Sequence, residues 1–65
     1  MTEEEIRIAV ERAIISLGLI EGDIDRILDA GWGDAGCRGH LKAAWDDILK
    51  AANSFKLARL RGGLD

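Results

Sequence analysis

Apolar residues recur every three or four positions along most of the chain, which is the spacing of one face of a helix. The first stripe of this kind comprises Ile6, Ala9, Val10, Ala13, Ile14 and Leu17. The second comprises Cys37, Leu41, Ala44, Trp45, Ile48, Ala52 and Phe55. No apolar run alternates with the period of two that is typical of a strand, so the pattern predicts an all-α fold.

Residues that favour helix ends flank the first stripe. Thr2 and Glu5 form the capping-box pattern T-E-E-E, which predicts a helix that begins at about Glu3. Gly18 follows the stripe and predicts the end of this helix, because glycine is the residue most often found just past a helix terminus.

Two further helices are predicted after Gly18. Asp23 is a candidate N-cap for a short helix that ends at Gly31, and Asp34 is a candidate N-cap for the longest helix, which ends at Gly62 and Gly63. We therefore expect a single domain over residues 1–65, built as a helical hairpin of two main helices with a short connecting helix. The residues expected in its core are Ile6, Val10, Ala13, Ile14, Leu17, Ile24, Ile27, Leu28, Leu41, Ala44, Trp45, Ile48, Ala52 and Phe55.

The small size of the chain favours self-association. A domain of 65 residues buries only about 60% of the surface of its unfolded chain, and the single cysteine, Cys37, excludes an internal disulfide. Ile8 and Ile15 are seven residues apart on the face opposite the first stripe, where a second packing surface would lie. We expect these two residues to assemble the protein as a helix-bundle homodimer.

Charge is unevenly distributed along the sequence. Residues 1–34 carry nine acids against three arginines, whereas residues 35–65 carry six basic residues against three acids. The simpler interpretation is attraction between two antiparallel elements; the alternative is a basic binding face near the carboxyl end. The net charge of −3 argues against general affinity for nucleic acids. The acidic amino-terminal segment has neither a signal-peptide pattern nor a membrane-spanning apolar run, so we expect a cytoplasmic protein with no membrane contact.

The stretch GWGDAGCRGH, residues 31–40, contains a G-x-G-x-x-G pattern. In a dinucleotide site this pattern follows a strand, whereas here it follows a predicted helix, so we interpret it as a helix-breaking connector. Cys37 and His40 are spaced to share a metal ion on a helix, but they supply only half of a tetrahedral site unless a symmetric dimer completes it. We expect neither a cofactor nor a metal.

No combination of residues indicates catalysis, because the carboxylates occupy capping and surface positions and no predicted pocket gathers them. The leading hypothesis is a non-catalytic protein–protein interaction module, a small regulator or inhibitor that binds the surface of a partner protein. The candidate partner-binding residues are Trp32, Arg38 and Lys42. The alternative for Trp32 is that its indole closes the open end of the helix pair.

A helix-turn-helix DNA-binding regulator is the second hypothesis. The predicted short helix, the turn at Gly31 and a following helix that carries Arg38, His40 and Lys42 have the order of that motif. The acidic first helix and the small number of basic residues make this hypothesis the less favoured one.

Overall fold

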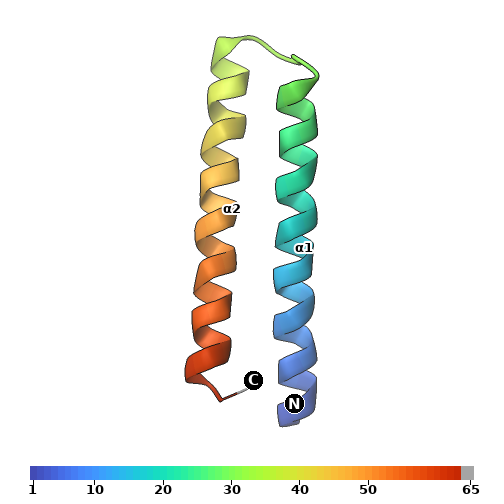
Figure 1. The fold of residues 1–65 in the computed structure, drawn as a ribbon, viewed down its shortest axis with the longest axis vertical. Coiled ribbons are helices and arrows are strands. Elements are labelled where there is room, and N and C mark those ends of the chain that lie inside the picture. Colours follow the sequence, from blue (N-terminus) through green and yellow to red (C-terminus); the bar gives the residue numbers. More distant parts are fainter. Residues whose placement is uncertain (64–65) are drawn as a thin grey trace.

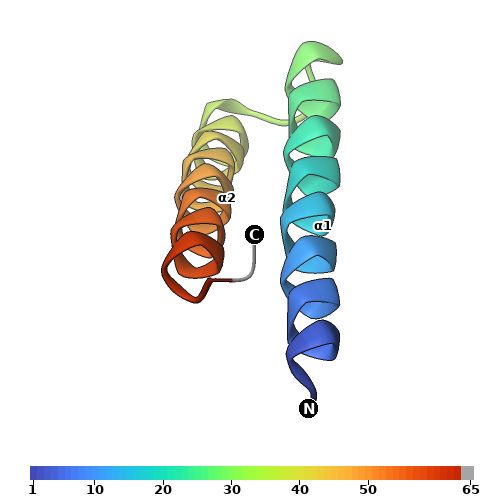
Figure 2. The ribbon, with the colours of Figure 1, turned by 60° about the horizontal axis from the view of Figure 1, so that its bottom comes forward.

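The computed structural model describes residues 1–63 as two long helices joined by a short turn (Figure 1). Helix α1 spans Glu3–Asp29 and helix α2 spans Ala35–Arg61, each with 27 residues. The helices run antiparallel and side by side, in a molecule that measures 46 × 16 × 15 Å (Figures 1 and 2). The prediction of an all-α helical hairpin is confirmed, and residues 1–63 contain no strand. Residues 64 and 65 of the predicted domain lie outside the described residues.

The two helices pack along one line of side chains, which we call the seam. Its positions on α1 are Arg7, Val10, Ile14, Leu17, Glu21, Ile24 and Leu28, and on α2 they are Arg38, Leu41, Trp45, Ile48, Ala52, Phe55 and Arg59. Successive seam positions are separated alternately by three and four residues, which is the heptad spacing of a coiled coil. All seam residues except Phe55 are at least half-buried.

The predicted core is only half-buried. Within residues 1–63, Ile24 is the only buried residue, with 7% of its surface exposed. Ile6, Ile27 and Phe55 remain 40%, 37% and 38% exposed, so their assignment to a buried core is wrong. The physical reason is that a side chain in a two-helix hairpin is covered from one direction only, whereas a closed core surrounds it. The other predicted core residues are half-buried.

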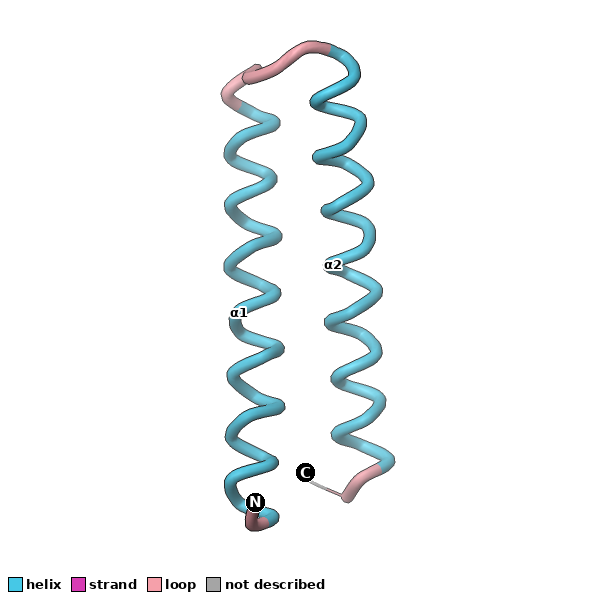
Figure 3. The backbone as a smooth tube through the Cα atoms, turned by 180° about the vertical axis from the view of Figure 1, so that it is seen from behind, coloured by secondary structure: helices cyan, strands magenta, loops and turns pink. Residues whose placement is uncertain are grey.

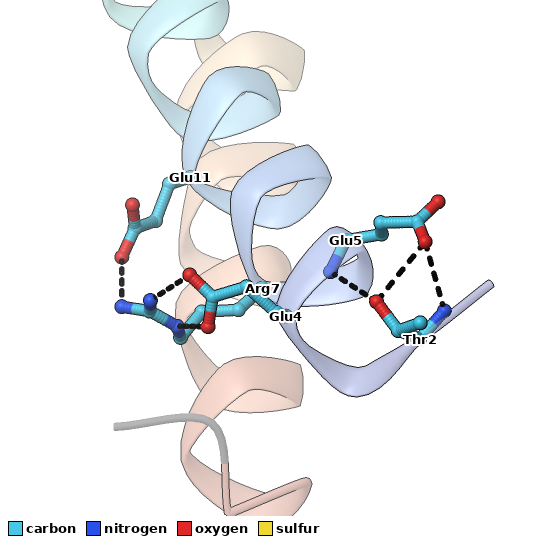
Figure 4. Close-up of polar contacts among 5 residues, drawn as sticks. All are labelled: Thr2, Glu4, Glu5, Arg7 and Glu11. Atoms are coloured by element: carbon cyan, nitrogen blue, oxygen red, sulfur yellow. Dashed lines mark hydrogen bonds and ion pairs between the residues drawn. The ribbon is translucent and has the colours of Figure 1, made fainter.

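The amino terminus of α1 is capped as predicted (Figure 4). The Thr2 hydroxyl accepts a hydrogen bond from the Glu5 amide at 3.1 Å, and the Glu5 carboxylate accepts one from the Thr2 amide at 3.4 Å. Arg7 forms an ion pair with Glu4 and a second, at 3.8 Å, with Glu11. The hydrogen bond to Glu4 raises the pKa of Arg7 above its usual value. These local contacts hold the first two turns of α1 in the helical state.

Residues 30–34 form the turn between the helices (Figure 3). Gly31 and Gly33 adopt φ angles of 73° and 88°, in the left-handed region that glycine enters without steric cost. Asp34 then caps α2, because its carboxylate accepts a hydrogen bond from the Cys37 amide at 2.8 Å. The prediction of a glycine-containing connector and an Asp34 cap is confirmed, as is the end of α2 at Gly62.

The predicted helix end at Gly18 is wrong, because α1 continues through Gly18 to Asp29. A single interior glycine costs about 1 kcal/mol relative to alanine, and the seam positions on either side, Leu17 and Glu21, both pack toward α2. Asp23 is accordingly not an N-cap; it lies inside α1 and forms an ion pair with Arg26. Tertiary packing therefore outweighs the local helix-breaking tendency of the glycine.

The separate short connecting helix does not exist in the described structure. The helix-turn-helix hypothesis depended on that helix, and the antiparallel hairpin does not provide the near-perpendicular crossing of the motif (Figure 1). DNA binding itself stays a prediction, but it loses its structural basis.

Replacement of Gly18 by alanine tests the continuity of α1. A Cβ atom at this position meets no atom within 4 Å, so Gly18→Ala is expected to raise the unfolding free energy by about 1 kcal/mol and Tm by about 4–8 °C. The control is Gly33→Ala, which lowers Tm because its Cβ would lie 2.8 Å from the Cys37 Sγ and its φ is positive. A lower Tm for Gly18→Ala, measured by circular dichroism, would contradict an uninterrupted helix.

Candidate protein interaction surfaces

Trp32 is displayed at the turn end of the hairpin. It lies between the two glycines with positive φ, and 61% of its surface is exposed. With Arg26, Ile27 and Ala30 it lines a shallow, mostly apolar depression beside the end of α1. The Trp32 indole therefore does not close the end of the helix pair but remains accessible.

Arg38, the second candidate partner-binding residue, makes a contact within the hairpin. Its guanidinium Nη2 donates a hydrogen bond to the Leu28 carbonyl at 3.0 Å, ten residues earlier in the chain. This carbonyl belongs to the last turn of α1, where the helix dipole is negative, and it also accepts a hydrogen bond from the Gly31 amide at 3.1 Å. The half-buried Arg38 thus ties the start of α2 to the end of α1. Its role in partner binding stays a prediction.

Lys42 is exposed on one face of the hairpin, where it lines a depression with Asp25, Leu28, Trp45 and Asp46. Asp25 and Lys42 each follow a seam position directly, on opposite helices, and they carry opposite charges. The same relation holds further from the turn for Glu11 and Lys56. This charged face favours the antiparallel pairing of the two helices within one chain.

Ile8 and Ile15 lie outside the seam, with 39% and 64% of their surfaces exposed. Ile8 lines a shallow depression on the outer surface of α1 together with Met1, Glu5, Ala9 and Arg12. Both residues are accessible to another molecule, and their role in self-association stays a prediction.

Two columns of apolar residues were not anticipated from the sequence. One, the isoleucine column, recurs every seven residues on α1 and consists of Ile6, Ala13, Ile20 and Ile27. The other, the alanine column, recurs every seven residues on α2 and consists of Cys37, Ala44, Ala51 and Ala58. The three isoleucines are 37–44% exposed. The seven-residue recurrence could have revealed the isoleucine column, but the predicted helix break at Gly18 divided it.

The two columns lie on the same face of the hairpin. Antiparallel helices are related by a local two-fold axis perpendicular to the plane that contains both, so equivalent heptad positions occur on one side of the pair. Asp25 and Lys42 show this relation, because these equivalent positions line one depression. The two columns occupy the equivalent positions on the other side of the seam, and we call that side the apolar face. Ala51 and Ala58 line a shallow depression on it, together with Ser54 and Phe55.

Cys37 and His40 do not form part of a larger set of metal ligands within residues 1–63. Cys37 is a free, half-buried thiol beside Gly33, whereas His40 is exposed. Neither described helix combines the length and the hydropathy needed to cross a bilayer.

Comparison with known proteins gives no match: no family model, no curated protein and no solved structure is significantly similar to this chain.

Truncation of Arg38 tests its role at the turn. Arg38→Ala removes the hydrogen bond to the Leu28 carbonyl and is expected to lower the unfolding free energy by about 1 kcal/mol. Lys42→Ala, one turn later on the same helix and exposed, serves as the control and should change it by less than about 0.5 kcal/mol. Urea unfolding measures both, and equal effects of the two substitutions would refute the structural role of Arg38.

Proposed function

We propose that this chain is a non-catalytic protein–protein interaction module, a small homodimeric regulator or inhibitor that acts by binding the surface of a partner protein. The observation that carries this proposal is the exposed indole of Trp32, which lies on a turn fixed at both ends by helix caps. Tryptophan is among the residues most enriched in binding hot spots. A side chain of this kind on an ordered backbone loses little conformational entropy when it binds.

The surroundings of Trp32 suit recognition of a partner protein. Arg26 and Ala30 border the indole, and Arg38 and Lys42 lie within the first two turns of α2. An apolar centre with a polar rim is the usual arrangement of a protein-binding patch. The matching partner surface offers an apolar pocket for the indole.

The cytoplasm is the proposed location, because the single cysteine, Cys37, is a free thiol. Self-association is part of the proposed function, since a two-helix hairpin with one buried residue among residues 1–63 has little core of its own.

Capture of the partner from lysate of the native host tests the role of Trp32. We expect Trp32→Ala to reduce recovery of the partner at least about tenfold, since loss of a hot-spot side chain costs about 2 kcal/mol or more in binding. Leu57→Ala is the matched control, because Leu57 is 58% exposed in the distal half of α2 and lies far from the turn. Equal recovery with both variants would reject Trp32 as the binding residue.

Emission from Trp32 provides a direct readout with the purified partner. In a Trp45→Phe background Trp32 is the only tryptophan, and partner binding is expected to shift its emission to shorter wavelength as water is excluded from the indole. An unchanged spectrum at saturating partner would contradict burial of Trp32 in the complex.

A further inference from the structure

We propose that the apolar face of the hairpin is covered by a second copy of the chain, with the isoleucine column of each copy packed against the alanine column of the other. This inference rests on the self-association included in the proposed function and specifies its surface and geometry. It places the dimer contact on Ile6, Ile20 and Ile27 and away from Ile8 and Ile15.

The exposed area of the hairpin is large enough to accommodate a second copy of the chain. The accessible surface of the chain is 4777 Å², whereas a compact monomer of 7.1 kDa exposes about 4,100 Å². The excess of about 700 Å² is close to the roughly 800 Å² that each partner buries in a standard protein interface. A second copy on the apolar face would therefore bring the buried area into the range of an ordinary folded protein.

Three of the four pairs that the two columns form are complementary in size, and the fourth, Ala13 with Ala51, is small on both sides. Large residues at positions 6, 20 and 27 of α1 have small counterparts at positions 58, 44 and 37 of α2, and each pair is equidistant from Trp32 along the chain. Because the two helices run antiparallel, the members of each pair lie at comparable distances from the turn. An isoleucine facing an alanine fills the space between two helices, whereas isoleucine facing isoleucine crowds it and alanine facing alanine leaves it empty.

The opposite net charges of the two helices favour the same packing of α1 against α2 of the other copy. Helix α1 carries eight carboxylates and three arginines, a net charge of −5, whereas α2 carries six basic side chains and two carboxylates, a net charge of +4. Packing of α1 against α2 of the partner subunit brings opposite charges together, and packing of α1 against its own counterpart brings like charges together.

These constraints define one symmetric four-helix bundle. A two-fold axis parallel to the helices exchanges the two copies, places α1 of each beside α2 of the other, and brings both turns to the same end. Every helix is then antiparallel to its neighbours, and the helix dipoles oppose one another favourably. Both Trp32 side chains lie at that end of the bundle, so the dimer would present two partner-binding turns together.

Sedimentation equilibrium of two glutamate variants identifies the face used. Ile20→Glu is expected to raise the dimer dissociation constant at least about 100-fold, because each dimer would bury two unpaired carboxylates at the contact. Ile15→Glu, a matched change on the same helix but off the apolar face, should alter it by no more than about threefold. Far-ultraviolet circular dichroism establishes that both variants are helical.

Disulfide formation between two single-cysteine variants tests the arrangement of the copies. Cys37→Ala/Ile20→Cys and Cys37→Ala/Ala44→Cys are mixed, unfolded together, refolded and oxidised. We expect the mixed disulfide to exceed both disulfides between identical chains, since position 20 of one copy would lie against position 44 of the other. A predominance of bonds between two copies of the Ile20→Cys variant would overturn the proposed pairing.

Two results of the sedimentation experiment would also overturn the proposal. A parent protein that is monomeric at all concentrations rejects the dimer, and dissociation by Ile15→Glu without dissociation by Ile20→Glu assigns the contact to the face that carries Ile8 and Ile15. Neither result bears on partner capture through Trp32, so failure of the dimer and failure of the proposed partner binding remain distinguishable.

Discussion

The seam between α1 and α2 is the contact on which the rest of the structure depends, and it can cover each side chain from one direction only. A heptad spacing on both helices places Leu17, Ile24, Leu41 and Ile48 along the seam, yet Ile24 is the one residue in positions 1–63 that becomes buried. Hydrophobic stabilisation grows with the apolar area removed from water, so a single seam stabilises such a chain weakly. The proposed second copy follows from this constraint, because it doubles the number of helix contacts without lengthening the chain.

The turn is ordered by contacts that leave its centre exposed. Asp34 caps α2, Arg38 occupies an acceptor at the end of α1, and Gly31 and Gly33 supply the left-handed conformations that reverse the chain. Trp32 lies between the two glycines, where it is largely exposed and lines the adjacent depression. An ordered backbone that displays a large apolar side chain is suited to binding, and this combination is the physical basis of the proposed function.

Local signals in the sequence predicted the start of α1 and both ends of α2, whereas the predicted end at Gly18 and cap at Asp23 are wrong because the interior of α1 depends on tertiary packing. The Thr2–Glu5 capping box, the Asp34 cap and the end at Gly62 each act through hydrogen bonds within a few residues, so the sequence suffices to identify them. Gly18 is different, because its helical state depends on packing of the flanking seam against residues about 30 positions away. The false break concealed the isoleucine column. The exposure of Trp32 depends on the geometry of the turn, which the sequence alone does not define.

The dependence of thermal stability on protein concentration tests the central claim, that one seam is insufficient and a second copy completes the core. Circular dichroism at the helical band would follow unfolding over about a hundredfold range of protein concentration, because mass action raises the Tm of a protein that folds as a dimer. We predict that Tm rises steadily with concentration for the parent chain. A Tm that stays constant over the whole range would show that the hairpin is stable as a monomer and would contradict the account.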